Sequence, residues 1–126
     1  MSNAVLPRNT TRQAEAMLYG EAARRLHQVS GAVIIVFMLV HVIVQAVRHV
    51  PMFASAKAAA PWLQALQEQN WVHAILFFCI AFHLFYGLKL LAGELGFSLR
   101  YKTAFWAIVI VSALFGMREV LRYAGI

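Results

Sequence analysis

The sequence predicts an all-α membrane protein with three transmembrane helices. Of the 126 residues, 62% are hydrophobic and only 13% are charged, whereas soluble domains are roughly 45–50% apolar. Most of the charges lie outside three long apolar runs, each of the length that a helix needs to cross a bilayer. Because three helices enclose only a small core, we also expect a partner chain.

The first predicted span covers residues 30–50 and carries no charge before Arg48. At 1.5 Å per residue it extends about 31 Å, which is enough for the hydrocarbon core. Residues 1–29 are predicted to be a cytoplasmic N-terminal segment of mixed polarity, without the apolar stretch of a secretory signal. We therefore expect the first span to direct its own insertion.

Residues 51–70 form the predicted outer connection between the first two spans. Pro61 suits the first turn of a short helix, which we expect to end at Gln69. Trp62 and Trp71 are typical of the boundary between membrane and water, where tryptophan side chains concentrate. The short helix is therefore predicted to be interfacial.

The second and third spans are predicted at residues 71–92 and 103–120, with a cytoplasmic loop at 93–102 between them. The third span reaches residue 120 if the Arg118 side chain extends back to the interface. Before Arg118 it has no charge and no histidine, so we expect it to serve helix packing. Residues 121–126 are then an outer tail.

The distribution of Lys and Arg predicts the orientation. With three spans, the N-terminal segment and the 93–102 loop share a side, which holds seven Lys and Arg against four on the other side. The positive-inside rule then places the N-terminus in the cytoplasm. Because these cations flank apolar runs and form no basic face, the net charge of +6 does not predict nucleic-acid binding.

Two of the five histidines are expected deep in the membrane, where an imidazole is costly unless it is paired or bound to a ligand. By helix rise, His41 and His83 lie about 24 Å and 20 Å from the cytoplasmic boundary, a difference of about 4 Å. A hydrogen bond to another helix and an axial bond to haem iron explain them about equally well. We expect no carboxylate in any span for a proton relay and no zinc-type Cys–His cluster, and the apolar surroundings of the histidines suit haem b.

A glycine follows His83 after one helical turn. In a helix, His83 and Gly87 share a face. Because Gly87 has no side chain, a flat and bulky group has room close to the backbone there. Lys89 adds a cation two residues later.

Two motifs resemble the cytochrome b membrane-anchor subunit of succinate dehydrogenase and of the related fumarate reductases, the succinate:quinone oxidoreductases. Leu26-His27-Gln28-Val29-Ser30-Gly31 is similar to the family's His-Arg-x-Ser-Gly at the start of the first span. Phe82-His83-x-x-x-Gly87-Leu88-Lys89 is similar to the family's His-x-x-x-Gly-Ile-Arg, and Glu94-x-Gly96 resembles the later acidic residue and glycine. The resemblance covers residues 24–120.

The resemblance implies that His83 is an axial ligand of haem b. It also implies a second three-helix anchor subunit, which supplies the other ligand, and a basic residue near a haem propionate, here Lys89 in place of arginine. Family members with two haems carry a further ligand in the first span, and Val40-His41-Val42 resembles that version. His41 is therefore the expected ligand of a second haem.

The same resemblance implies a quinone site formed in part by His27 and Ser30. The family's arginine after the first histidine is Gln28 here. Arg24 and Arg25, one turn earlier, are the candidates to replace it.

The function implied is electron transfer between a membrane quinone and a soluble flavoprotein and iron–sulfur subunit that interconvert succinate and fumarate. The chain is expected to dock these subunits at the inner (plasma) membrane, surrounded by lipid, and to bear no catalytic residue for succinate chemistry. Two alternatives remain open: a b-type anchor for another soluble dehydrogenase, and a haem-free membrane scaffold.

Overall fold

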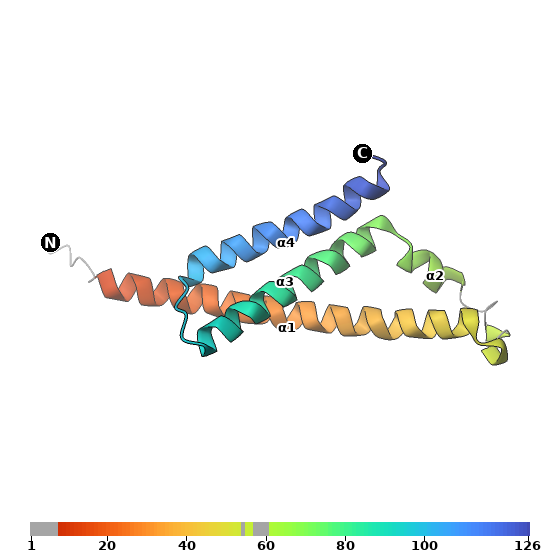
Figure 1. Ribbon diagram of the computed structural model, residues 1–126, viewed down its shortest axis with the longest axis horizontal. Coiled ribbons are helices and arrows are strands. Elements are labelled where there is room, and N and C mark those ends of the chain that lie inside the picture. The colour runs from red at the N-terminus through yellow and green to blue at the C-terminus, as the bar shows by residue number, and fades with distance from the viewer. Residues whose placement is uncertain (1–7, 54, 57–60) are drawn as a thin grey trace, which may run out of the picture.

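The computed structural model describes residues 8–53, 55–56 and 61–126, and the described residues are almost entirely helical, without a strand. The elements are α1 (Arg8–His49), the 3-10 helix η1 (Pro51–Phe53), α2 (Pro61–Gln67), α3 (Asn70–Glu94) and α4 (Tyr101–Tyr123) (Figure 1). Three of these helices contain stretches that are long and apolar enough to cross a membrane: Thr10–His49, Asn70–Glu94 and Tyr101–Tyr123. The prediction of an all-α protein with three candidate membrane helices is confirmed.

α1 is a single helix of 42 residues that joins the predicted N-terminal segment to the predicted first span without a break. No proline lies between Arg8 and His49, so the sequence leaves this stretch uninterrupted. α1 ends at His49, and Val50 precedes Pro51, because a residue that precedes proline is disfavoured in a helical conformation. α2 begins on Pro61, where a missing backbone N–H costs nothing.

A short helix between the first two spans is also present, as α2, although it ends at Gln67 rather than Gln69. Residues 54 and 57–60 of the predicted 51–70 connection lie outside the described residues, as do residues 1–7 of the N-terminal segment. The side chains of Trp62 and Trp71 are largely exposed. The interfacial position of α2 stays a prediction.

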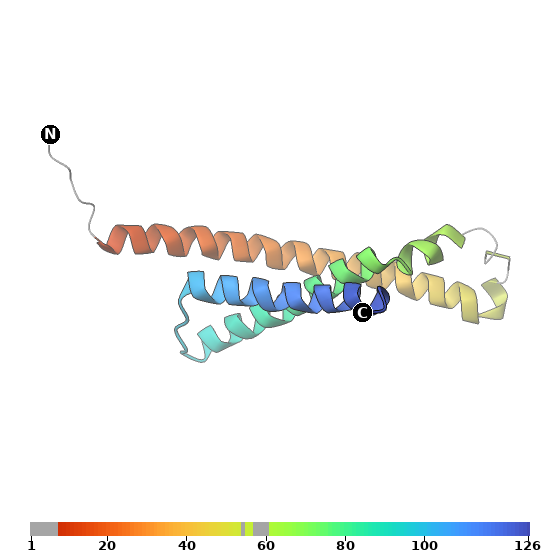
Figure 2. The ribbon, with the colours of Figure 1, turned by 90° about the horizontal axis from the view of Figure 1, so that it is seen from above.

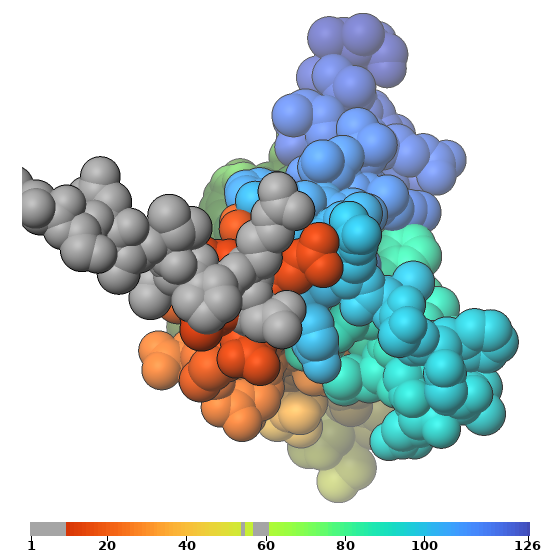
Figure 3. Space-filling model, turned by 90° about the vertical axis from the view of Figure 1, so that its left-hand side faces the viewer, coloured from red at the N-terminus to blue at the C-terminus, as the bar shows by residue number. Residues whose placement is uncertain are grey.

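α3 and α4 form an antiparallel pair, and α1 crosses α3 at an angle (Figures 1 and 2). The pair packs closely at Gly116 of α4, where an added Cβ would lie 2.9 Å from the carbonyl oxygen of Ala74. The N-terminal half of α1 contacts the α3–α4 pair. Glu15 of α1 forms an ion pair there with Lys102 of α4 (3.7 Å). Figure 3 shows this end, with the α3–α4 connection (cyan) beside the beginning of α1 (red and orange).

The core is small. Phe82 and Tyr86 of α3 and Ala23 of α1 form its buried cluster, with partly buried side chains packed around them. Large apolar side chains remain exposed on all three long helices, as expected for surfaces that meet lipid or a partner. The buried cluster lies beside the crossing of α1 and α3, and this crossing positions the candidate site.

Candidate functional site

The two sequence motifs meet at the crossing of α1 and α3. The imidazole rings of His27 and His83 stack with their centroids 4.0 Å apart and their planes 10° apart. Both side chains are half-buried, whereas Ser30, one turn along α1 from His27, is only 1% exposed. The structure therefore brings together three residues that the sequence singled out: His27, Ser30 and His83.

The hydrogen bonds around His83 define its tautomer. Its Nδ1 lies 3.3 Å from the carbonyl oxygen of His27 and 3.4 Å from the Ser30 hydroxyl oxygen. The Ser30 hydroxyl itself donates to the His27 carbonyl (2.8 Å). Because a carbonyl oxygen only accepts, Nδ1 of His83 carries a proton, and Nε2 is the ring nitrogen that remains to bind a metal.

Gly31 allows this close approach of α1 to His83. A Cβ added at Gly31 would lie 3.0 Å from Cε1 and 3.3 Å from Nδ1 of His83, which is tighter than ordinary contact. Gly87 has the opposite surroundings, since a Cβ added there would have no atom within 4 Å. The space predicted beside Gly87 is therefore open among the described residues. The glycine that packs against the His83 ring is Gly31.

His27 has an unsatisfied group. Its Nδ1 is buried and has no hydrogen-bond partner among the described residues. The ring of Tyr86 lies 5.1 Å from the His27 ring, at an interplanar angle of 50°. Sequence reasoning did not select Tyr86, although it lies three residues after His83 and therefore on the same helical face. Tyr86 is 5% exposed and closes one side of the candidate site.

Lys89, Arg24 and Arg25 all lie near this end of the molecule but have other partners. The Lys89 ammonium is 4.1 Å from the centroid of the Tyr101 ring and 5.3 Å from that of Tyr86. Arg24 and Arg25 both bond to the carboxylate of Glu21, and their side chains are largely exposed. Neither arginine reaches His27 or Ser30 in this conformation.

His41 lies far from His83. Ten residues of α1 separate His41 from Gly31, which contacts His83. This corresponds to about 15 Å along the axis of α1, whereas the prediction gave a difference in depth of about 4 Å. The prediction was wrong because it took Arg25 and Gly96 as equal in depth. The connection after α3 instead lies beside Gly20 and Glu15, where Tyr101 and Lys102 contact α1. The ring of His41 stacks on Phe37 at 5.8 Å.

α4 contains a buried carboxylate that sequence reasoning missed. Glu119 is 6% exposed, and within the described residues no hydrogen bond or ion pair involves it. Ser112 is fully buried, and its hydroxyl also has no partner there. With Gly116 these residues follow the spacing of one helical face, which was the available signal. The prediction that no span holds a carboxylate was wrong, because Glu119 lies within the predicted third span, residues 103–120, and α4 continues to Tyr123.

The donor set of the crossing is compatible with haem but not with a metal ion held by this chain alone. Among the described residues, no group of three or more His, Cys, Asp and Glu side chains could hold a metal ion. A haem requires only one axial imidazole from each of two partners. His83 meets this requirement through its free Nε2, with the open side at Gly87 one turn away.

The chain was compared with protein-family models, curated proteins and solved structures. None of the three comparisons gave a significant match.

Proposed function

We propose that this chain is the haem b-containing membrane anchor of a succinate:quinone oxidoreductase. The observation that carries the proposal is the contact between the two motifs, whose histidines are 56 residues apart in sequence. The first motif supplies the carbonyl, the hydroxyl and the glycine that hold the histidine of the second. An arrangement that leaves one imidazole nitrogen free and fixes the other supports a ligand role for His83.

In this proposal, His83 is the axial ligand that this chain contributes, through Nε2. Haem b, when bound, accepts and donates single electrons. The carbonyl of His27 and the hydroxyl of Ser30 hold the Nδ1 proton of His83, which orients the ring and raises its basicity. Lys89 supplies a positive charge for a propionate, and its ammonium leaves the face of the Tyr101 ring to do so.

His41 is proposed as the ligand of a second haem. About 15 Å along α1 separates His41 from Gly31, which contacts His83, so the two histidines are too far apart to hold the same iron and would hold different haems. In each case the opposite ligand comes from the second three-helix anchor.

The quinone site is proposed beside His27 and Ser30. The buried, unpartnered Nδ1 of His27 is a group that a quinone oxygen would satisfy if this nitrogen carries the proton. Ser30 contributes after its hydroxyl turns away from the His27 carbonyl. Arg24 or Arg25 would have to leave Glu21 to reach the same oxygen, and their exposure leaves them free to move.

The proposed complex also contains an iron–sulfur subunit and a flavoprotein subunit on the cytoplasmic side of the inner (plasma) membrane. The basic residues near the beginning of α1 and the α3–α4 connection form the docking end. The second anchor covers apolar surface that this chain leaves exposed. Succinate chemistry belongs to the soluble subunits, and this chain shares only the quinone site.

The test is a reduced-minus-oxidised absorption spectrum, with a count of haem per chain, on the complex purified from its own membranes. We expect His83→Ala to lose one haem b and His41→Ala to lose the other. His73→Ala is the matched control, because His73 lies in α3 but contacts Tyr123 (5.2 Å) and the Gln69 carbonyl (3.1 Å), away from the crossing. Absence of haem from the unaltered complex would refute the proposal. Retention of all haem in His83→Ala would refute the assignment of the ligand.

A further inference from the structure

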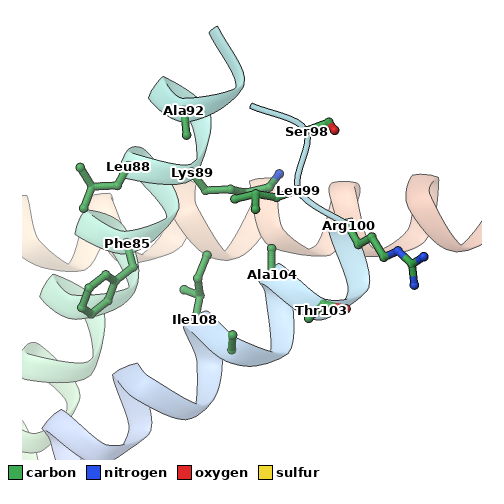
Figure 4. A pocket seen from close by; sticks show the side chains of 11 residues that line it. Phe85, Leu88, Lys89, Ala92, Ser98, Leu99, Arg100, Thr103, Ala104 and Ile108 are labelled. Atoms are coloured by element: carbon green, nitrogen blue, oxygen red, sulfur yellow. The ribbon is translucent and has the colours of Figure 1, made fainter. Parts of the chain in front are cut away.

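A cleft of about 600 Å³ lies between the C-terminal half of α3 and the first turns of α4 (Figure 4). We call it the basic cleft; it is lined by Phe85, Leu88, Lys89, Ala92, Ser98, Leu99, Arg100, Thr103, Ala104, Ala107 and Ile108. Its floor is apolar. Its polar groups are two cations and two hydroxyls, and the lining includes no carboxylate.

The two cations of the basic cleft lack acidic partners. Neither Lys89 nor Arg100 forms an ion pair with a carboxylate among the described residues. Of the acidic side chains at this end of the molecule, Glu15 pairs with Lys102 and Glu21 with two arginines, while Glu94 ends α3 and lies outside the lining of the cleft. The first turn of α4 also contains no acidic residue. The lining of the cleft therefore has positive charge at one end without a carboxylate in contact with it.

The surroundings of the basic cleft are apolar as well. In the connection between α3 and α4, the side chains of Leu95, Phe97 and Leu99 are between one-half and three-quarters exposed. An exposed apolar connection is stable where it meets lipid. In Figure 4, Phe85 and Ile108 face the space between the helices, while Lys89 extends towards Leu99. A ligand in this cleft therefore has its charged group at the connection and its apolar part along the helices.

We propose that the basic cleft binds one phospholipid with an anionic headgroup. Its phosphate pairs with Arg100, and Ser98 and Thr103 supply hydroxyl donors. An acyl chain covers the floor at Phe85, Ala107 and Ile108. Basic pockets between membrane helices bind anionic lipid headgroups through the same combination of charge and apolar surface. A soluble anion satisfies the cations but leaves the floor uncovered, so the complementarity favours a lipid.

The test compares phosphatidylglycerol with phosphatidylcholine of the same acyl chains. The full chain, with the subunits that it retains, is extracted from vesicles that contain both lipids in equal amounts, and retained lipid is counted by native mass spectrometry. We expect one retained phosphatidylglycerol, and we expect Arg100→Gln to lower its preference over phosphatidylcholine about fivefold. Arg48→Gln removes the same charge in the last turn of α1, away from the basic cleft, and should leave the preference unchanged.

Ala107→Phe tests the apolar floor without changing any charge. Ala107 is exposed on α4, so a larger side chain there enters the basic cleft without displacing the core. We expect it to lower retention of both lipids. A large excess of inorganic phosphate should not displace the bound lipid, and displacement by phosphate would show that the site recognises a free anion.

Three further outcomes would overturn the proposal. They are equal retention of the two lipids by the unaltered protein, equal loss of preference in Arg100→Gln and Arg48→Gln, and no effect of Ala107→Phe. Because the proposed haem site also involves Lys89, the test varies Arg100 instead. Haem spectra of the same preparations separate the two proposals: Arg100→Gln should keep its haem whether or not it keeps the lipid.

Discussion

The stacked rings of His27 and His83 connect two helices through residues 56 positions apart in the chain. The contact has three parts: the ring stack, the bond from Nδ1 of His83 to the His27 carbonyl, and the second contact of Nδ1 with the Ser30 hydroxyl. Each part depends on α1 coming close to α3 at Gly31. This crossing therefore couples the packing of two membrane helices to the orientation of one imidazole, and changes in its small residues should affect both.

Gly31→Ala is expected to destabilise the fold by about 1–3 kcal/mol, because its Cβ would overlap the His83 ring and force α1 and α3 apart. The measurement is the thermal unfolding midpoint in detergent. Gly93→Ala is the control, since a Cβ there meets no atom within 4 Å and the substitution should favour the helix by about 0.5–1 kcal/mol. Equal midpoints for the two variants would contradict the close contact at Gly31.

Ser30→Ala should loosen the orientation of the His83 ring without removing Nε2, the atom proposed to bind haem iron. The variant loses the hydroxyl that lies 3.4 Å from Nδ1 and keeps the His27 carbonyl at 3.3 Å. Under the proposed function, haem affinity should fall about 10–100-fold, the range seen when a partner of a metal-binding histidine is removed. Haem retention during dilution, followed by absorption, gives the measurement. Loss of haem as complete as in His83→Ala would mean that Ser30 does more than orient the ring.

Ser112→Ala should leave the stability of the fold unchanged or raise it. Ser112 is fully buried, and its hydroxyl has no partner among the described residues, so its removal eliminates a desolvated group. We expect the variant to be unchanged or up to about 1 kcal/mol more stable. The readout is again the unfolding midpoint in detergent.

Gly116→Ala, one turn from Ser112 on the same helix, provides the contrast. Its Cβ would lie 2.9 Å from the backbone oxygen of Ala74, which cannot turn aside as a side chain does. We expect a loss of about 1–3 kcal/mol from separation of α3 and α4. If Ser112→Ala were the more damaging of the two, the packing described for α4 would be wrong.

The three candidate spans predict which sites share a side of the membrane. Single cysteines at Gln13, Phe97 and Ile126, in a Cys79→Ala background, can be labelled with a reagent that does not cross membranes. All three positions are exposed in the structure. Gln13→Cys and Phe97→Cys should react from the same side, and Ile126→Cys from the opposite side. Reaction of all three from one side would refute three crossings.

Much of the candidate site was identifiable from the sequence, because the histidines stand out against apolar surroundings. His27, Ser30 and His83 were selected by motif and depth, and the structure brings them together. Tyr86 and Glu119 were not selected. Tyr86 resembles any other aromatic residue of an apolar span, and Glu119 lies beside Arg118, where an exposed helix end is the simpler expectation. Their burial depends on which helical face meets a neighbour.

The sequence by itself determined the helices. Apolar runs of sufficient length must satisfy their backbone hydrogen bonds internally, and the positions of Pro51 and Pro61 limit where α1 ends and α2 begins. Only the tertiary structure decided at which residues the helices cross. The crossing point depends on where a small residue lets two helices approach, here Gly31 against the His83 side chain and Gly116 against the backbone of Ala74. Helix rise alone does not contain this information, which is why it gave a difference in depth of only about 4 Å between His41 and His83.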